Sequence, residues 1–176
     1  MRLLVTTLLV VLALAGCKEN DAESAAPDPI PLTADATGHF CQMNILEHEG
    51  PKGQIHLAGY PMPLWFSQVR DGLAYVKSPE QNAEILVFYV NDMGEARDWA
   101  TPGIDNWIDA NHAYFVVGSD AVGGMGAPEM VPFSSQDTAK EFAHTHGGEV
   151  MRLDDIPLDL LLAPIEIDTA ALENAG

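Results

Sequence analysis

The chain has 176 residues, of which 26 are acidic and 8 are basic, so its formal net charge is −18 at pH 7. A charge of this sign and size excludes nucleic acid and anionic surfaces as partners held by charge attraction. The length is that of one domain with additional terminal segments.

The N-terminus has the pattern of an export signal. Arg2 precedes an apolar run at 3–14, and Leu-Ala-Gly-Cys follows at 14–17. The run is shorter than the ~20 residues of a comfortable membrane span, and it ends in small residues, as signal peptides do. The Leu-Ala-Gly-Cys ending resembles the bacterial lipobox, which implies a signal peptide at 1–16 and lipid on Cys17. A plain cleaved signal or an N-terminal anchor is the alternative. Lys18 after the lipidated residue favours the outer membrane, facing the periplasm.

Composition divides the rest of the chain. Residues 17–37 contain three prolines among Ala, Asp, Glu and Ser, which predicts a lipid-anchored flexible tether. We expect the folded domain at 38–167 and a disordered tail at 168–176. Loss of residues 1–16 removes one positive charge, so the mature chain carries about −19.

The domain contains the same pattern twice. Apolar segments are expected at 40–46, 54–57 and 85–90, with a helix at 67–76 capped by Ser67. The second pass has segments at 113–117, 130–133 and 149–153, with a helix at 135–146 that Gly147 and Gly148 end. An offset of 67 residues aligns Gly59 with Gly126 and also aligns two Phe-Ser pairs. The sequence therefore predicts an α+β fold, a single domain of two tandem ββαβ-like units.

Two sulfur residues stand close together at the start of this domain. Residues 38–44 read Gly-His-Phe-Cys-Gln-Met-Asn, with Cys41 and Met43 two positions apart. On an extended segment both side chains point to one face, and a thiolate with a thioether selects Cu(I). Lipid on Cys17 leaves Cys41 without a disulfide partner, and such a thiol is either buried or protected by a metal. The alternative is that both residues belong to the core.

A glycine-rich loop at 118–130 is the second candidate, with Met125 in its Gly-Gly-Met-Gly sequence. Glycines let a backbone turn at positive φ and approach other atoms closely. A phosphate site is disfavoured because no Gly-Lys-Ser/Thr follows and the loop carries acidic residues but no Lys or Arg. We expect Met125 to be a third soft ligand, on a loop whose flexibility at Gly124 allows release. An ordinary flexible hairpin is the alternative.

The six histidines offer other third ligands. His112 and His48 are the alternatives to Met125. His39 would point away from Cys41 on an extended segment. His144 and His146 lie two apart on a helix, about 200° around its axis, and poorly share one ion.

The lipobox, the tether, the sequence at 38–44, the Gly-Gly-Met-Gly-Ala loop and Pro-Phe-Ser before a helix together resemble the NosL family. These are the copper-binding accessory lipoproteins of nitrous oxide reductase. The resemblance covers nearly the whole mature domain and implies a pair of ββαβ motifs, in agreement with the repeat. It also implies a periplasmic Cu(I) metallochaperone that delivers copper for the copper centres of nitrous oxide reductase. Such a protein works beside a membrane ABC transporter maturation complex.

Two other classes remain open. An enzyme of the organomercurial-lyase type, whose fold the family resembles, needs paired thiols and a carboxylate. The mature chain has one thiol, so we expect no enzyme. A copper-free structural lipoprotein that scaffolds a periplasmic complex would bury Cys41 as an inert residue and take up no metal.

Overall fold

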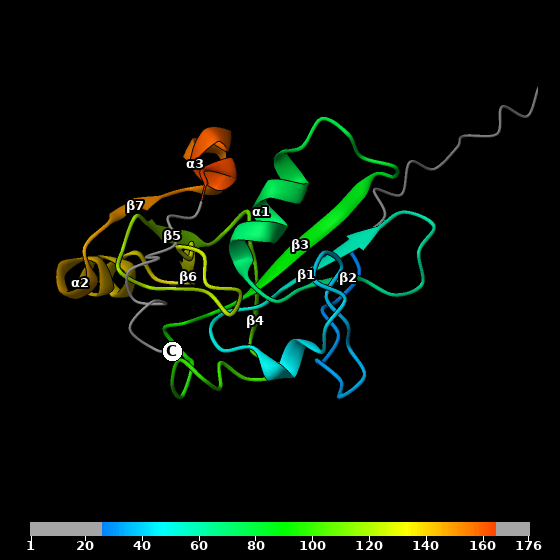
Figure 1. Cartoon of the computed structure of the whole chain (residues 1–176), viewed down its shortest axis with the longest axis horizontal. Coiled ribbons are helices and arrows are strands. Elements are labelled where there is room, and N and C mark those ends of the chain that lie inside the picture. Colours follow the sequence, from blue (N-terminus) through cyan, green and yellow to red (C-terminus); the bar gives the residue numbers. More distant parts are fainter. Residues whose placement is uncertain (1–25, 165–176) are drawn as a thin grey trace, which may run out of the picture.

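Each half of the chain folds into a hairpin, a helix and a returning strand (Figure 1). The computed structural model describes residues 26–164. The first unit consists of β1 (Gly53–Leu57), β2 (Leu64–Phe66), α1 (Val69–Lys77) and β3 (Ile85–Asn91). The second consists of β5 (Tyr114–Val117), β6 (Val131–Phe133), α2 (Gln136–His146) and β7 (Glu149–Met151). The predicted α+β fold with two ββαβ units is confirmed.

In each sheet the first strand of the unit, β1 or β5, lies between the second strand of its hairpin and the strand that returns after the helix. The strand order is β2-β1-β3-β4 in one sheet and β6-β5-β7 in the other, with antiparallel pairing throughout. Strand β4 (Trp107–Asp109) extends the first sheet. Two short 3₁₀ helices, Ile45–Glu47 and Leu153–Asp155, and a terminal helix α3 (Leu158–Leu162) complete the described elements.

The internal repeat is visible in backbone geometry. Gly59 and Gly126, which the offset of 67 aligns, have φ angles of +82° and +81°. The same offset superimposes β2 on β6 and the start of α1 on that of α2. A positive φ favours glycine, so the repeated glycine reflects a repeated turn.

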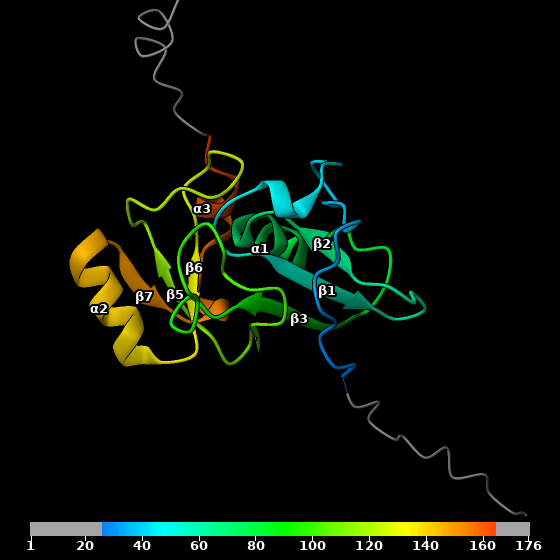
Figure 2. The same cartoon turned by 90° about the horizontal axis from the view of Figure 1, so that it is seen from below.

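One hydrophobic core joins the two units, which lie side by side in both views (Figures 1 and 2). Val69 and Leu73 of α1 both point into it, because residues four apart lie on the same face of a helix. Phe115 and Val117 enter the same core from β5, whereas Val116 packs on the α2 side, because successive strand residues face opposite ways. The two units therefore form one folded body.

The two helices are capped differently. Ser135 caps α2 by accepting from Thr138 N, and Gly147 at φ +74° follows its last residue, as expected. Ser67 was expected to cap α1, but it is buried and the N-cap position is Gln68, whose side chain makes no capping bond. Glu129 from the glycine-rich loop supplies the cap instead.

The structure corrects two expectations at the N-terminal side. The segment 40–46 is a turn followed by a 3₁₀ helix, and β2 is the strand that pairs with β1. Residues 26–37, expected to be tether, pack on the domain: Leu32 is buried, and Ile30 N donates to Gln54 Oε1 at 3.0 Å. The signal peptide, Cys17 and the tail from 165 lie outside the described residues. None of the helices within residues 26–164 has the length and apolar character that a membrane span requires.

Candidate metal centre

The segment that carries Cys41 and Met43 is a closed turn. Gly38 N donates to Met43 O at 2.9 Å, and Gln42 N donates to Gly38 O at 2.9 Å. Gln42 has φ +57°, the left-handed region that a non-glycine residue rarely adopts, and its amide side chain donates to His39 O at 2.7 Å. The expectation of an extended segment is wrong, and a hydrogen-bonded turn holds both sulfur residues instead.

The thiol of Cys41 lies against the floor of this turn. A Cβ atom on residue 38 would overlap Cys41 Sγ and stand 3.3 Å from Ile45 Cδ1, so only glycine fits there. Cys41 is a free, half-buried cysteine, and Met43 is 41% exposed. The turn therefore presents one thiol and one thioether at the surface, without burying either in the core.

Aromatic contacts attach the turn to the first unit. His39 N donates to Trp65 O at 2.7 Å, and the His39 ring meets Phe66 at 5.8 Å and Tyr75 at 5.5 Å between centroids. Phe40 also packs on Phe66 at 5.5 Å. The two residues before Cys41 are thus anchored on β2 and α1, and His39 has a packing role.

The glycine-rich loop folds into a small hairpin with Met125 at its tip. Gly123 N donates to Ala127 O at 2.8 Å, and Val122 and Pro128 form an isolated bridge. Met125 is 37% exposed. The structure places the thioether on an ordered turn of the second unit.

The loop packs closely on the first unit, as its glycines predict. His48 Nδ1 lies 3.1 Å from Gly124 O, and a Cβ atom on residue 124 would stand 2.5 Å from His48 Cβ and 2.8 Å from Glu49 O. His48 follows the 3₁₀ helix that begins directly after Asn44. The Met125 loop is thereby fixed to the segment that continues from the Cys41–Met43 turn.

The hydrogen bond to Gly124 O determines which nitrogen of the His48 ring carries the proton. A carbonyl oxygen only accepts, so Nδ1 carries the proton of this hydrogen bond and Nε2 is the lone-pair nitrogen of the neutral ring. That Nε2 is buried and has no hydrogen-bond partner among the described residues. Of the other candidates, His112 is exposed beside Asp109, and His56 is buried and lies 2.9 Å from Gln54 Oε1.

Two titratable side chains are buried at this junction: Glu129 of the loop, and Lys52 of the segment before β1. Glu129 is 1% exposed, and its carboxylate accepts from Val69 N at 3.2 Å, Arg70 N at 3.0 Å and Met130 N at 2.8 Å. Burial raises the pKa of Glu129 to about 7, and burial lowers the pKa of Lys52 to about 8; the two opposite charges partly offset both changes. Glu129 thus fastens the Met125 loop to the start of α1.

Neither this role of Glu129 nor the burial of Lys52 was predicted from the sequence. Both are charged types that are rarely fully buried, and the Val69 and Arg70 N–H groups that bind Glu129 are about 60 residues away along the chain. The acidic residue inside a loop without Lys or Arg was the one visible signal.

Within residues 26–164, no group of three or more His, Cys, Asp and Glu side chains is arranged to hold a metal ion. Methionine is not among these four residue types, so its thioethers remain possible ligands. The fold and the site together define a class: a two-unit α+β domain that presents soft sulfur donors on a constrained surface turn.

Comparison with known proteins agrees with this class. The NosL family model matches residues 29–161. The copper-binding lipoprotein NosL of Achromobacter cycloclastes is 54% identical over 170 residues, covering 94% of this chain and 87% of the relative. The protein of the same name from Stutzerimonas stutzeri is 34% identical over 97% of this chain and 86% of its own length.

A solved structure extends the likeness to the fold. The crystal structure of the copper chaperone NosL from Shewanella denitrificans superimposes with a TM-score of 0.69 at 32% identity, covering 73% of this chain and 95% of that one. The chain belongs to the NosL family.

Proposed function

We propose that this protein is a periplasmic Cu(I)-binding metallochaperone, anchored to the envelope by lipid on Cys17, that delivers copper for the copper centres of nitrous oxide reductase. The observation that carries the proposal is the constrained turn that holds Cys41 and Met43 together at the surface. The names of the relatives, copper-binding lipoprotein and copper chaperone, support it.

The chemistry needs only soft donors in a low-coordinate site. Cys41 binds as thiolate, since the thiolate is the form that ligates metals, and Met43 adds a neutral thioether. Met125 is the proposed third donor. The buried Nε2 of His48, beside the same loop, is the alternative.

The exposure of the sulfur ligands would allow copper to be transferred to another protein. A half-buried thiol and two thioethers that are each more than a third exposed leave one side of the ion open to a recipient's ligands. Ligand exchange requires no acid, base or nucleophile, so the proposed protein is not an enzyme. Its proposed partners are the reductase and the membrane ABC transporter complex of its maturation, and no nucleic acid.

The test is a transfer assay without oxygen. The mature protein, loaded with one equivalent of Cu(I), is mixed with copper-free nitrous oxide reductase and its ABC transporter complex, and copper in the separated reductase is measured. We expect transfer from the wild-type protein and none above background from Cys41→Ser protein, which lacks the thiolate. Equal copper in the reductase with both proteins would refute delivery from this site.

The same assay addresses the alternative of a copper-free scaffold. A scaffold retains no Cu(I) through gel filtration yet still associates with the transporter complex. Copper retained by the wild-type protein and lost in Cys41→Ser excludes that alternative.

A further inference from the structure

A second group of soft donors lies where the end of β3 meets α2. Two neighbouring hollows, of about 580 Å³ and 240 Å³, share three lining residues: Met93, Phe142 and His146. These three side chains therefore form the wall between the hollows. They belong to different elements from those that carry Cys41, Met43 and Met125.

Two contacts orient the half-exposed ring of His146. His146 Nδ1 lies 2.9 Å from Asp120 Oδ1, and Phe142 stacks on the imidazole at 4.3 Å with 24° between the planes. An ionised carboxylate only accepts, so Nδ1 carries the proton and the neutral ring presents Nε2 as its lone pair. A carboxylate bonded to the second ring nitrogen is how proteins orient histidines that ligate metals.

Met93 brings a thioether to the same wall. Its backbone N donates to Pro132 O at 2.9 Å, which fixes the end of β3 beside β6. The side chain is partly buried among the residues that pack on α2. A thioether and an imidazole are both neutral donors, and the pair suits a soft monovalent cation.

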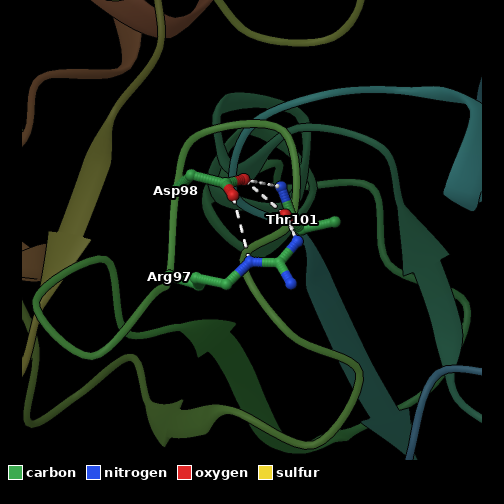
Figure 3. A network of polar contacts seen from close by, with 3 residues as sticks. All are labelled: Arg97, Asp98 and Thr101. Carbon is green, nitrogen blue, oxygen red and sulfur yellow. Dashed lines mark hydrogen bonds and ion pairs between the residues drawn. The ribbon is translucent and has the colours of Figure 1, made fainter.

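Trp99 lines the larger hollow on a segment that is tightly held. Asp98 accepts from Thr101 N at 2.7 Å and pairs with Arg97 at 3.1 Å (Figure 3). Trp99 O also accepts from Gly50 N at 2.9 Å. The indole lies against Gly50, so that a Cβ atom added to residue 50 would stand 3.0–3.3 Å from the indole atoms. An aromatic face of this kind attracts a cation.

The surrounding charge favours the same occupant. Asp120 lines the larger hollow and Glu141 the smaller one, and Arg97 engages Asp98 rather than these two. Within residues 26–164, His146 and Asp120 are not joined by a third His, Cys, Asp or Glu that could complete a metal site. A divalent ion such as zinc, which takes three or four ligands of these types, therefore lacks enough of them here.

We propose that Met93 and His146 form a second Cu(I) site, in which His146 Nε2 and the Met93 sulfur bind one ion beside Trp99. The site has no thiolate, so it is weaker than the Cys41 site and fills after it. It does not rest on the proposed function, because none of its donors belongs to the Cys41 turn.

The test uses the mature chain with Cys41→Ser, Met43→Leu and Met125→Leu, which removes the sulfur donors of the first site. Ag(I), which has the softness of Cu(I) without its redox chemistry, is titrated while the Met93 methyl and His146 ring signals are followed by NMR. We expect saturable shifts at both residues and at the Trp99 indole. His112, which pairs with Asp109 on the surface, is the internal reference and stays unshifted.

Matched variants decide the assignment. His146→Ala and Met93→Leu should each weaken Ag(I) binding about tenfold or more, and Asp120→Asn about tenfold. His144→Ala, on the same helix but outside both hollows, should leave it unchanged. Absence of saturable shifts at Met93 and His146, or equal affinity in Met93→Leu and His144→Ala, would overturn the proposal. Neither result bears on the Cys41 site, because its sulfur donors have been removed from the protein tested. Failure of the Met93–His146 site can therefore be distinguished from failure of the proposed function.

Discussion

The sulfur of Cys41 occupies the space that a side chain on residue 38 would need, so Gly38 and Cys41 form a matched pair. Gly38 does not have a positive φ, so glycine is required there only because a larger residue would clash with the Cys41 sulfur. The pair explains why the Cys41–Met43 turn closes tightly around its thiol.

Replacing Gly38 by alanine should therefore damage the site. The added methyl group must displace Cys41 Sγ or Ile45, and we expect Cu(I) affinity to fall about tenfold and stability by about 1–3 kcal/mol. Chelator competition and urea unfolding measure the two effects. Gly94→Ala is the milder comparison, since its Cβ would stand 3.2 Å from Asp92 Oδ1 and 3.3 Å from Thr138 Cγ2, and a shift of a few tenths of an ångström relieves both contacts. Wild-type copper affinity in Gly38→Ala would contradict this account of the turn.

Gly124 is a packing residue, which revises its interpretation as a free hinge. In Gly124→Ala the methyl group meets His48 and Glu49, so the loop must move away from the first unit. We expect a loss of about 1–3 kcal/mol in the free energy of unfolding. Amide hydrogen exchange at 123–127 should also become faster.

Gly126→Ala separates this steric effect from backbone strain. Residue 126 has open space around its Cβ position but φ +81°, so alanine there costs about 1–2 kcal/mol through its backbone conformation without a clash. The His48 hydrogen bond to the loop should survive in Gly126→Ala and be lost in Gly124→Ala. Unchanged exchange at 123–127 in Gly124→Ala would show that the loop is not docked as described.

Glu129 should make stability depend on pH. Its pKa is raised from 4.5 to about 7 by burial, so the folded state holds the proton more tightly than the unfolded state. The stabilisation is present below about pH 4.5 and is lost as pH rises towards 7, by about 3 kcal/mol at most.

The matched variant is Glu129→Gln, which cannot ionise. Urea unfolding at several pH values between 4.5 and 7 should show wild-type stability falling relative to the variant, with other titrating groups cancelling in the difference. In the variant an amide NH₂ also replaces an oxygen that accepts backbone N–H groups, and this lowers its stability by an amount that does not depend on pH. The loss shifts the whole profile of the variant and leaves the pH-dependent fall of the wild type visible in the difference. Parallel pH profiles would mean that Glu129 keeps its ordinary pKa.

The anchor is tested by Cys17→Ser. Without a lipid-bearing residue, the protein should appear in the soluble periplasmic fraction, with copper affinity equal to wild type because the site lies in the folded domain. Membrane fractionation and copper titration measure the two properties. Retention in detergent-dependent fractions would indicate that the apolar segment at 3–14 itself anchors the chain.

Much of the fold could be predicted from the sequence because its signals are local. The β-branched run of β3, the capping serine of α2 and the Gly-Gly stop after it each specify their own structure. The repeat was detectable because Gly59 and Gly126 sustain the same positive φ.

The candidate site was predicted only in its residue types. A turn closed by the unusual φ of Gln42 has no sequence signature, since the side chain that stabilises it bonds to backbone carbonyls. The packing of residues 26–37 was missed because proline-rich composition resembles a tether, and the contact of Leu32 with the domain depends on tertiary structure. The same is true of the Glu129 cap on α1, whose partners are far apart in the chain.

The central claim is that Cys41 and Met43 hold Cu(I) on one turn, with Met125 as the third donor. The most direct measurement is an anaerobic titration of the mature protein with Cu(I) against a competing chelator. The account predicts one tight equivalent that is nearly abolished in Cys41→Ser, because the only thiolate is lost, and weakened far less in Met43→Leu and Met125→Leu, which each lose a neutral donor. Equal Cu(I) retention by the wild type, Cys41→Ser, and the Cys41→Ser/Met43→Leu double variant would contradict it.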